Sequence, residues 1–235
     1  MDGERHQRLW RLVTDRAHGS DFAGWAEVVC AVAVDQTDVD GAAISLRTSA
    51  RAQELAAASD PWARRLEELQ YTVGEGPGVE AFTTAGPVLV ADLPDAGSRW
   101  PGFVDTATVD GLAAVFALPL QEGAIQLGTL DLYRRRPGAL STEALADVAV
   151  LADLATGALL TDATPDAATS WAGGEAPGHY DDVNVATGML AAELRITVDD
   201  AFLRLRAHAF STGHPLLDVA RAVLNRQLRA DTFQE

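Results

Sequence analysis

The sequence of 235 residues contains no lysine, and its only cysteine is Cys30. A single thiol cannot form an internal disulfide, and its position in the apolar run from Trp25 to Val34 predicts a buried side chain, as expected in a reducing compartment. The chain also lacks any stretch of about 18 uninterrupted apolar residues, and its N-terminal segment has no apolar core of a signal peptide. We therefore expect a cytoplasmic protein that does not span a membrane.

Catalytic groups are equally scarce. All five histidines lie outside residues 19 to 178, which leaves the central part of the chain without an imidazole for a general base, a haem ligand or a nucleophilic pair. Without lysine, neither a phosphoryl-receiver site nor a nucleotide-binding P-loop can be formed, and the glycine-rich run at residues 74–78 is better explained as a turn in which Pro77 opens a helix. The sequence predicts no enzyme activity, no metal site and no cofactor.

The charge is strongly acidic, but it is unevenly distributed. The 34 acidic side chains outnumber 18 arginines and give a formal net charge of −16, which argues against nucleic acid being attracted to the whole surface. Residues 195 to 230 differ, because six arginines minus three aspartates give a local net of +3. A nucleic-acid site is therefore expected in this segment, although arginines that only keep surface helices soluble would give the same count.

The same C-terminal segment predicts three short amphipathic helices that share one core. Thr197 stands three residues before Asp200, an acidic variant of a capping box, so the second helix should begin there and end at Gly213. Pro215 is expected at the first position of the third helix. The predicted buried positions are Val183, Ala186, Leu190 and Leu194 in the first helix, Phe202, Leu205 and Ala209 in the second, and Leu216, Val219, Ala220, Val223 and Leu224 in the third.

The order and spacing of these residues resemble the ANTAR domain, a three-helix RNA-binding module of bacterial antiterminators. The matching positions are Ala186-Thr187-Gly188-Met189-Leu190, Ala201, Leu205-Arg206, Ala209 and Val219-Ala220. The resemblance implies structured RNA stem-loops as the partner, and the polar residues of the two later helices become candidates for RNA binding: Arg204, Arg206, His208, Ser211, Arg221, Asn225 and Arg229. Arg206 also falls within the apolar arc of its helix, so an internal ion pair, for example to Asp218, is an equal alternative. Thr187 occupies a position where many members carry lysine, so no phosphate contact is assigned to it.

The first 160 residues predict a mixed domain of helices and strands. Helical spacing occurs at residues 9–13, 22–35, 61–71 and 142–160, and strand patterns occur at 40–47, 53–57, 113–120 and 126–133. Between them, Gly74-Glu75-Gly76-Pro77-Gly78, Gly86-Pro87-Val88 and Asp92 are similar to the central signature of GAF domains, a small-molecule sensor fold related to PAS. The GAF branch that reduces methionine sulfoxide uses several cysteines, which Cys30 alone cannot supply.

The resemblance to GAF domains implies a ligand pocket between the sheet and the helices. Its candidate lining residues are the aromatic side chains of the domain, each of which could equally be ordinary core: Trp62, Tyr71, Phe82, Trp100, Phe103 and Phe116. The wide apolar arc of the helix at 142–160 is explained equally well by a homodimer contact and by packing within its own domain.

Together these features predict an α+β protein with a PAS/GAF-like antiparallel sheet flanked by helices and a C-terminal three-helix ANTAR bundle. We expect a GAF-like sensor domain at residues 1–160, a linker at 161–179 that is rich in Ala, Gly, Pro and Thr, and an ANTAR domain at 180–235. The predicted function is transcription antitermination by RNA binding under the control of the sensor domain, with a homodimer and an unknown small-molecule ligand as partners. The alternative is a sensing dimer whose C-terminal helices form a docking bundle without RNA binding.

Overall fold

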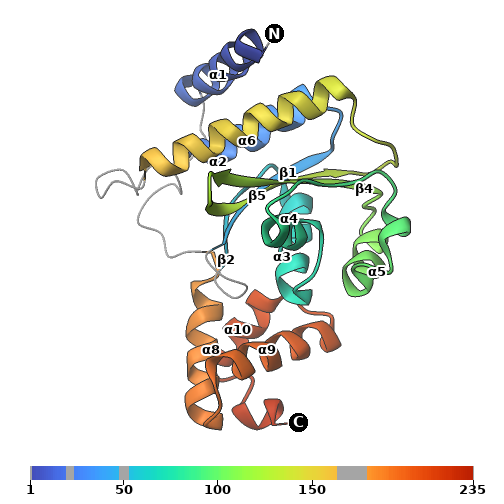
Figure 1. The fold of residues 1–235 in the computed structure, drawn as a ribbon. Helices are drawn as coiled ribbons and strands as arrows, with labels where there is room; N and C mark the ends of the chain where they lie inside the picture. Colours follow the sequence, from blue (N-terminus) through green and yellow to red (C-terminus); the bar gives the residue numbers. More distant parts are fainter. Residues whose placement is uncertain (1, 20–23, 48–52, 163–178, 235) are drawn as a thin grey trace.

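The computed structural model describes residues 2–19, 24–47, 53–162 and 179–234. Five strands form one antiparallel sheet in the order β2-β1-β5-β4-β3, with helices on both faces (Figure 1). The strands are β1 (Gly41–Arg47), β2 (Gln53–Ala58), β3 (Val88–Val90), β4 (Ala114–Glu122) and β5 (Ile125–Arg134). The helices of this domain are α1 (Asp2–Gly19), α2 (Trp25–Gln36), α3 (Pro61–Val73), α4 (Pro77–Thr84), the 3₁₀ helix η1 (Leu93–Ala96), α5 (Pro101–Val109) and α6 (Thr142–Asp162).

The two faces of the sheet bury different sets of side chains, because successive residues of a strand point to opposite sides. Along β4, Ala114, Phe116 and Leu118 belong to the core beneath α1, α2 and α6, whereas Val115 and Ala117 belong to the core facing α3, α4 and α5. The second core continues without interruption into the C-terminal helices.

The C-terminal helices lie at the end of the molecule opposite α1 (Figure 1). They are α8 (Asp181–Leu194), α9 (Val198–Thr212) and α10 (Leu216–Leu224), followed by the 3₁₀ helix η2 (Ala230–Phe233). The predicted capping is confirmed, because the Thr197 hydroxyl accepts a hydrogen bond from the Asp200 N–H at 3.1 Å and Gly213 ends α9 with a φ of 67°. Pro215 precedes α10 as its N-cap, one position earlier than predicted.

The predicted elements of the sheet domain are confirmed, with three additions. Strand β3, η1 and α5 were not predicted, since they have only three, four and nine residues. The glycine-rich run is a turn as expected: Gly74 ends α3 with a φ of 73°, Gly76 has a φ of 140°, and Pro77 is the first residue of α4. Most of the predicted linker, residues 163–178, lies outside the described residues.

Candidate nucleic-acid interface and domain junction

The predicted RNA-binding residues of α9 do not share one open surface. Arg204 donates a hydrogen bond from Nη1 to the Phe233 carbonyl at 2.6 Å, and the His208 ring lies 5.0 Å from the Phe233 ring. Helix η2 therefore covers this side of α9. Ser211 is exposed and donates to the His208 carbonyl at 3.1 Å. The sequence did not reveal η2, because a four-residue helix with one buried side chain has no recognisable period.

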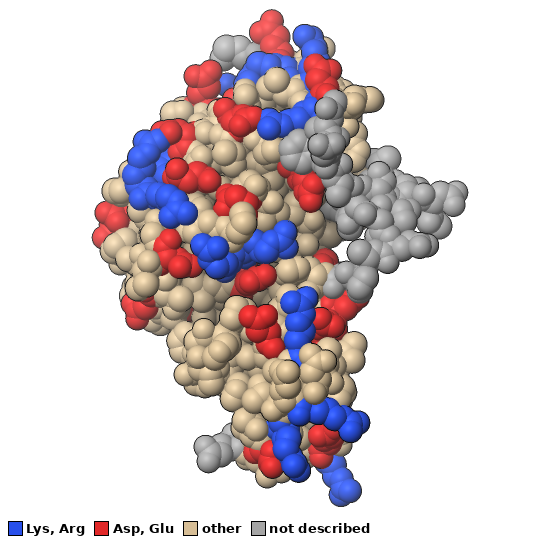
Figure 2. Space-filling view, turned by 180° about the vertical axis from the view of Figure 1, so that it is seen from behind, with Lys and Arg blue, Asp and Glu red and all other residues tan. Residues whose placement is uncertain are grey.

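The α10 candidates occupy two further places. The Arg221 Nε lies 3.0 Å from an Asp182 carboxylate oxygen at the start of α8. Asn225 and Arg229 are exposed, and the Arg229 side chain is 83% accessible and 3.8 Å from Asp231. Figure 2 shows basic and acidic side chains interspersed at the free end of this bundle. Arg204, Arg221 and Arg229 thus lie in separate places with different protein partners, and not in the continuous basic strip that helical spacing suggested.

Arg206 contacts the sheet domain, which neither sequence-based alternative foresaw. Its Nε donates to the Thr72 carbonyl at 2.8 Å, and its guanidinium lies where a side chain on Gly74 would be, 1.4 Å from the position of an ideal Cβ. Burial lowers the pKa of Arg206, because the charged form is partly desolvated. The partner is a backbone oxygen at the end of another helix, so no side-chain pattern could have indicated it.

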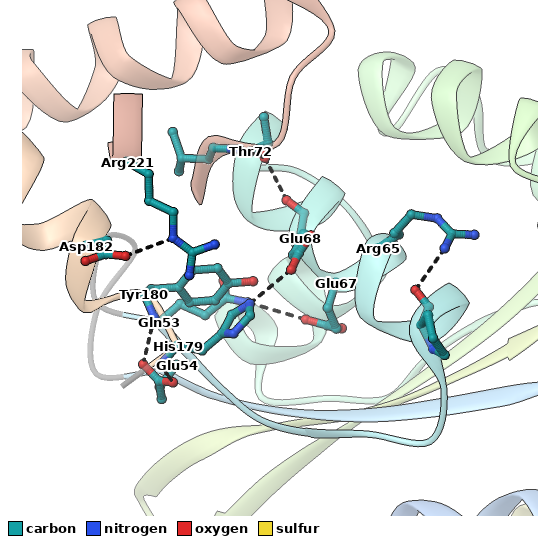
Figure 3. Close-up of polar contacts among 12 residues, drawn as sticks. Gln53, Glu54, Arg65, Glu67, Glu68, Thr72, His179, Tyr180, Asp182 and Arg221 are labelled. Atoms are coloured by element: carbon teal, nitrogen blue, oxygen red, sulfur yellow. Dashed lines mark hydrogen bonds and ion pairs between the residues drawn. The ribbon is translucent and has the colours of Figure 1, made fainter. Parts of the chain in front are cut away.

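Further contacts join the start of α8 to α3 and β2 (Figure 3). The His179 Nε2 lies 3.0 Å from a Glu68 carboxylate oxygen, and the backbone N–H groups of His179 and Tyr180 donate to the Glu54 carboxylate. Glu54 thereby caps a helix of the other domain, where a carboxylate is favoured by the helix dipole. Burial raises the pKa of Glu54, and these two N–H groups oppose that shift.

Aromatic packing completes the junction. The buried Tyr180 ring lies 4.3 Å from the Tyr71 ring at the end of α3, and Phe202 of α9 lies 5.7 Å from Tyr71 on another side. The Leu216 N–H donates to the Thr72 hydroxyl at 3.2 Å. The last turn of α3 is therefore contacted by the residue before α8, by the first residue of α10 and by side chains of α9.

A buried polar cluster lies beneath α3, on the sheet face that continues into the bundle. Glu67 accepts hydrogen bonds from Tyr133 at 2.7 Å, Gln70 at 2.9 Å and Gln53 at 3.3 Å. Asp131 is fully buried nearby, and desolvation together with the charge of Glu67 raises its pKa well above the ordinary range. Burial and the adjacent carboxylate therefore both disfavour ionisation of Asp131.

The glycine-rich turn is fitted against this cluster. The Gly78 N–H donates to Gln70 Oε1 at 2.8 Å, and a Cβ on Gly78 would lie 2.7 Å from an Asp131 carboxylate oxygen. A Cβ on Gly76 would lie 2.6 Å from Gln70 Oε1. These contacts give the motif a packing role in addition to its turn geometry, because polar groups of α3 and β5 occupy the space next to its backbone.

The predicted ligand-pocket residues are not gathered around one cavity. Trp62, Tyr71, Trp100 and Phe103 belong to the core on the α3 side, where their polar atoms have partners: Trp62 Nε1 donates to the Asp110 carbonyl and Trp100 Nε1 to Glu80. Phe82 is half-buried on α4, whereas Phe116 lies on the opposite face of the sheet. Four of the six therefore share one core, and Phe116 is separated from them by the sheet.

Other expectations concern absent features. Within the described residues there is no group of three potential metal ligands, and no helix is long and apolar enough to cross a bilayer. Cys30 is buried, and burial raises the pKa of its thiol. Thr187, the departure from the lysine of many ANTAR domains, is also buried, and its hydroxyl donates to the Val183 carbonyl at 2.6 Å. Its role is internal packing of α8.

Comparisons with known proteins agree with this arrangement. The family model described as GAF domain matches residues 25–159, and the one described as ANTAR domain matches residues 176–224. Among solved structures, the GAF domain of a phosphoenolpyruvate-protein phosphotransferase from Coxiella burnetii is 16% identical, with a TM-score of 0.55 over 70% of this chain and 98% of that one. This likeness supports the fold alone. No curated protein sequence matches significantly.

Two further structures share lower similarity. The GAF domain of an Acinetobacter phosphoenolpyruvate-protein phosphotransferase is 15% identical, with a TM-score of 0.48 and coverage of 67% of this chain and 91% of that one. A free methionine-R-sulfoxide reductase from Neisseria meningitidis is 17% identical, with a TM-score of 0.46 and coverage of 65% and 84%.

The described residues thus form an antiparallel sheet domain followed by a C-terminal helical bundle. The chain belongs to the GAF domain family and carries an ANTAR domain after the GAF domain. Both are regulatory domains, of the kinds that sense signals and control transcription.

Proposed function

We propose that the protein is a transcription antitermination regulator that binds RNA stem-loops through its ANTAR domain under the control of its GAF domain. The observation that carries the proposal is the ANTAR match over residues 176–224, in a C-terminal segment that contains six arginines. We propose domain boundaries at 1–160 and 180–235 with a linker between them. The RNA-binding residues remain those predicted: Arg204, Arg206, His208, Ser211, Arg221, Asn225 and Arg229.

The docked arrangement supports a way for the GAF domain to control RNA binding. Arg206 is held by Thr72 of the GAF domain, whereas Arg229 is open to solvent. Release of the bundle from α3 would free Arg206 for a phosphate or a loop base. A signal that changes the docking free energy by about 1 to 3 kcal/mol would change RNA affinity 5- to 150-fold, because the two equilibria are linked.

RNA binding is tested by a gel-shift series on the full chain, with a pool of structured hairpins at two salt concentrations. We expect binding that weakens as salt rises, since released counterions drive phosphate contacts. Arg229→Glu should weaken binding at low salt and reduce the salt slope by about 1. Arg11→Glu makes the same charge change on an exposed residue of α1 and should leave the slope unchanged. If no hairpin is shifted at the low or at the high salt concentration, the alternative is favoured, in which the C-terminal helices form a docking bundle without RNA binding.

We also propose a homodimer, formed by the surface of α1, α2 and α6. Trp10 is 47% exposed and stacks on Trp25 at 6.0 Å, beside a cavity of about 410 Å³ that also reaches Leu154 and Ala158. Exposed aromatic side chains of this kind are enriched in protein interfaces. Sedimentation velocity should give a dimer for the wild-type chain and a monomer for Trp10→Ser. If both proteins form dimers to the same extent, the dimer interface does not include the surface around Trp10.

A dimer would present two ANTAR domains to paired stem-loops. The second contact would then be intramolecular, which raises the effective concentration without any new contact.

A further inference from the structure

A cavity of about 550 Å³ lies between the two domains, where α9 passes the end of α3 and the start of α5. Its apolar wall is formed by Val73 from the GAF domain and by Leu203, Ala207 and Phe210 from the ANTAR domain. Leu203 and Phe210 are 64% and 53% exposed, although both are large apolar side chains. Ligand sites are commonly concave, largely apolar and located at domain interfaces.

One cationic group faces this apolar wall. Arg206 lines the cavity, and its Nε is held by Thr72, which fixes the guanidinium and leaves its Nη groups without a hydrogen-bond partner among the described residues. The ion pairs of the described part of the bundle join Arg221 to Asp182 and Arg229 to Asp231, and none includes Arg206. Burial disfavours the charged guanidinium, and an anion on its free Nη groups would favour it.

Glu75 also lines the cavity, and its negative charge favours the charged form of Arg206. Its Oε1 accepts hydrogen bonds from the backbone N–H groups of Gly102 at 2.7 Å and Phe103 at 3.2 Å, in the first turn of α5. The carboxylate is thereby oriented toward the helix N-terminus, where negative charge is favoured. Arg206 is left as the polar group that can receive a ligand anion.

Two glycines preserve the shape of the cavity. A Cβ on Gly102 would lie 3.2 Å from Glu75 Oε1 and 3.5 Å from the Phe210 ring, so any larger side chain would enter the space beside that ring. A Cβ on Gly74 would occupy the place of the Arg206 guanidinium. The absence of side chains at these positions keeps both the apolar and the cationic part of the site open.

We propose that this cavity binds a small organic acid, with its carboxylate on the Nη groups of Arg206 and its apolar body between Leu203, Ala207 and Phe210. Arginine recognises carboxylates through paired N–H donors, and the apolar walls would select an aromatic or aliphatic body. The ligand would contact α3 and α5 of one domain and α9 of the other. Binding would therefore stabilise the docked arrangement. Any effect on RNA affinity rests on the proposed function, whereas ligand binding itself does not.

The test uses 4-phenylbutyrate and its uncharged counterpart 4-phenylbutyramide, titrated calorimetrically into the full chain without RNA. We expect one saturable site for the acid and at least about tenfold weaker binding of the amide, because a charge-assisted hydrogen bond contributes that much. Arg206→Gln should weaken the acid by a similar factor and leave the amide unchanged. Equal affinities of acid and amide, or no saturable binding of the acid at millimolar concentrations, would overturn the proposal.

A second pair of variants locates the site. Ala207→Trp fills the cavity from α9 and should abolish binding of the acid, whereas Ala192→Trp adds the same side chain on an exposed position of α8 and should not change it. Circular dichroism confirms that each variant is folded. If Ala207→Trp is folded and still binds the acid with wild-type affinity, the acid occupies another site and the proposal is wrong. RNA gel shifts on the same proteins separate this outcome from a failure of RNA binding.

Discussion

Replacing Gly74 by alanine perturbs the domain junction at one atom. Gly74 ends α3 with a φ of 73°, so any other residue there lowers the unfolding free energy by about 1 to 2 kcal/mol because of the left-handed backbone. The added Cβ would also lie 1.4 Å from Arg206 Nη2, which forces the guanidinium away from Thr72. Loss of a hydrogen bond from a charged donor costs about 1.5 to 3 kcal/mol. The expected loss of unfolding free energy for Gly74→Ala is therefore about 2.5 to 5 kcal/mol.

Gly213 provides a matched control, because it also ends a helix, with a φ of 67°, and has no atom within 4 Å of an added Cβ. Gly213→Ala should show only the backbone cost. Urea unfolding of the full chain, followed by circular dichroism, measures both variants. In an Arg206→Ala background the cost of Gly74→Ala should fall to that of Gly213→Ala. Equal losses in the wild-type background would show that Arg206 is not held at Gly74, and the docked junction would be refuted.

Three further predictions concern single residues. Burial and the neighbouring charge of Glu67 raise the pKa of Asp131 above its ordinary 3.8, so wild-type stability should fall as the pH rises above about 4. Asp131→Asn lacks this ionisation, so in urea unfolding its stability relative to wild type should increase from about pH 4 to about pH 8, and a difference that does not change with pH would contradict this. Because burial also raises the pKa of the Cys30 thiol, iodoacetamide should modify Cys30 only after unfolding, as read by mass spectrometry, and rapid native modification would contradict this. Thr197→Ala removes the cap on Asp200 and should lower the unfolding free energy by about 1 kcal/mol, while Thr197→Ser should restore it, both measured by thermal unfolding.

Local chemistry was enough to predict most helices and strands. The capping pair of Thr197 and Asp200 and the terminating Gly213 were predicted because each acts within one helix turn. The buried positions of α9 followed from the helical period, and Phe202, Leu205 and Ala209 are indeed buried. The short elements β3 and η2 were not predicted, since three or four residues give no period to detect.

The candidate site was less accessible to this reasoning. Helical spacing placed Arg204 and His208 away from the core of α9 but could not show that Phe233, 29 residues later than Arg204, would cover them. Likewise, alternation along β4 places Phe116 on the opposite face of the sheet from Val115 and Ala117. Alternation alone does not show which helices cover each face, so it could not show which face would hold a ligand.

By itself, the sequence determined the two families, the α+β class and the buried positions of the C-terminal helices, because these follow from composition, motif spacing and interactions within a few residues. Only the tertiary structure decided the partners of the long cationic side chains. Arg206 bonds a backbone carbonyl of Thr72, 134 residues away, beside a glycine that leaves room for it. Such a contact forms only where docking of the two domains brings a backbone carbonyl of one domain within reach of a long side chain of the other.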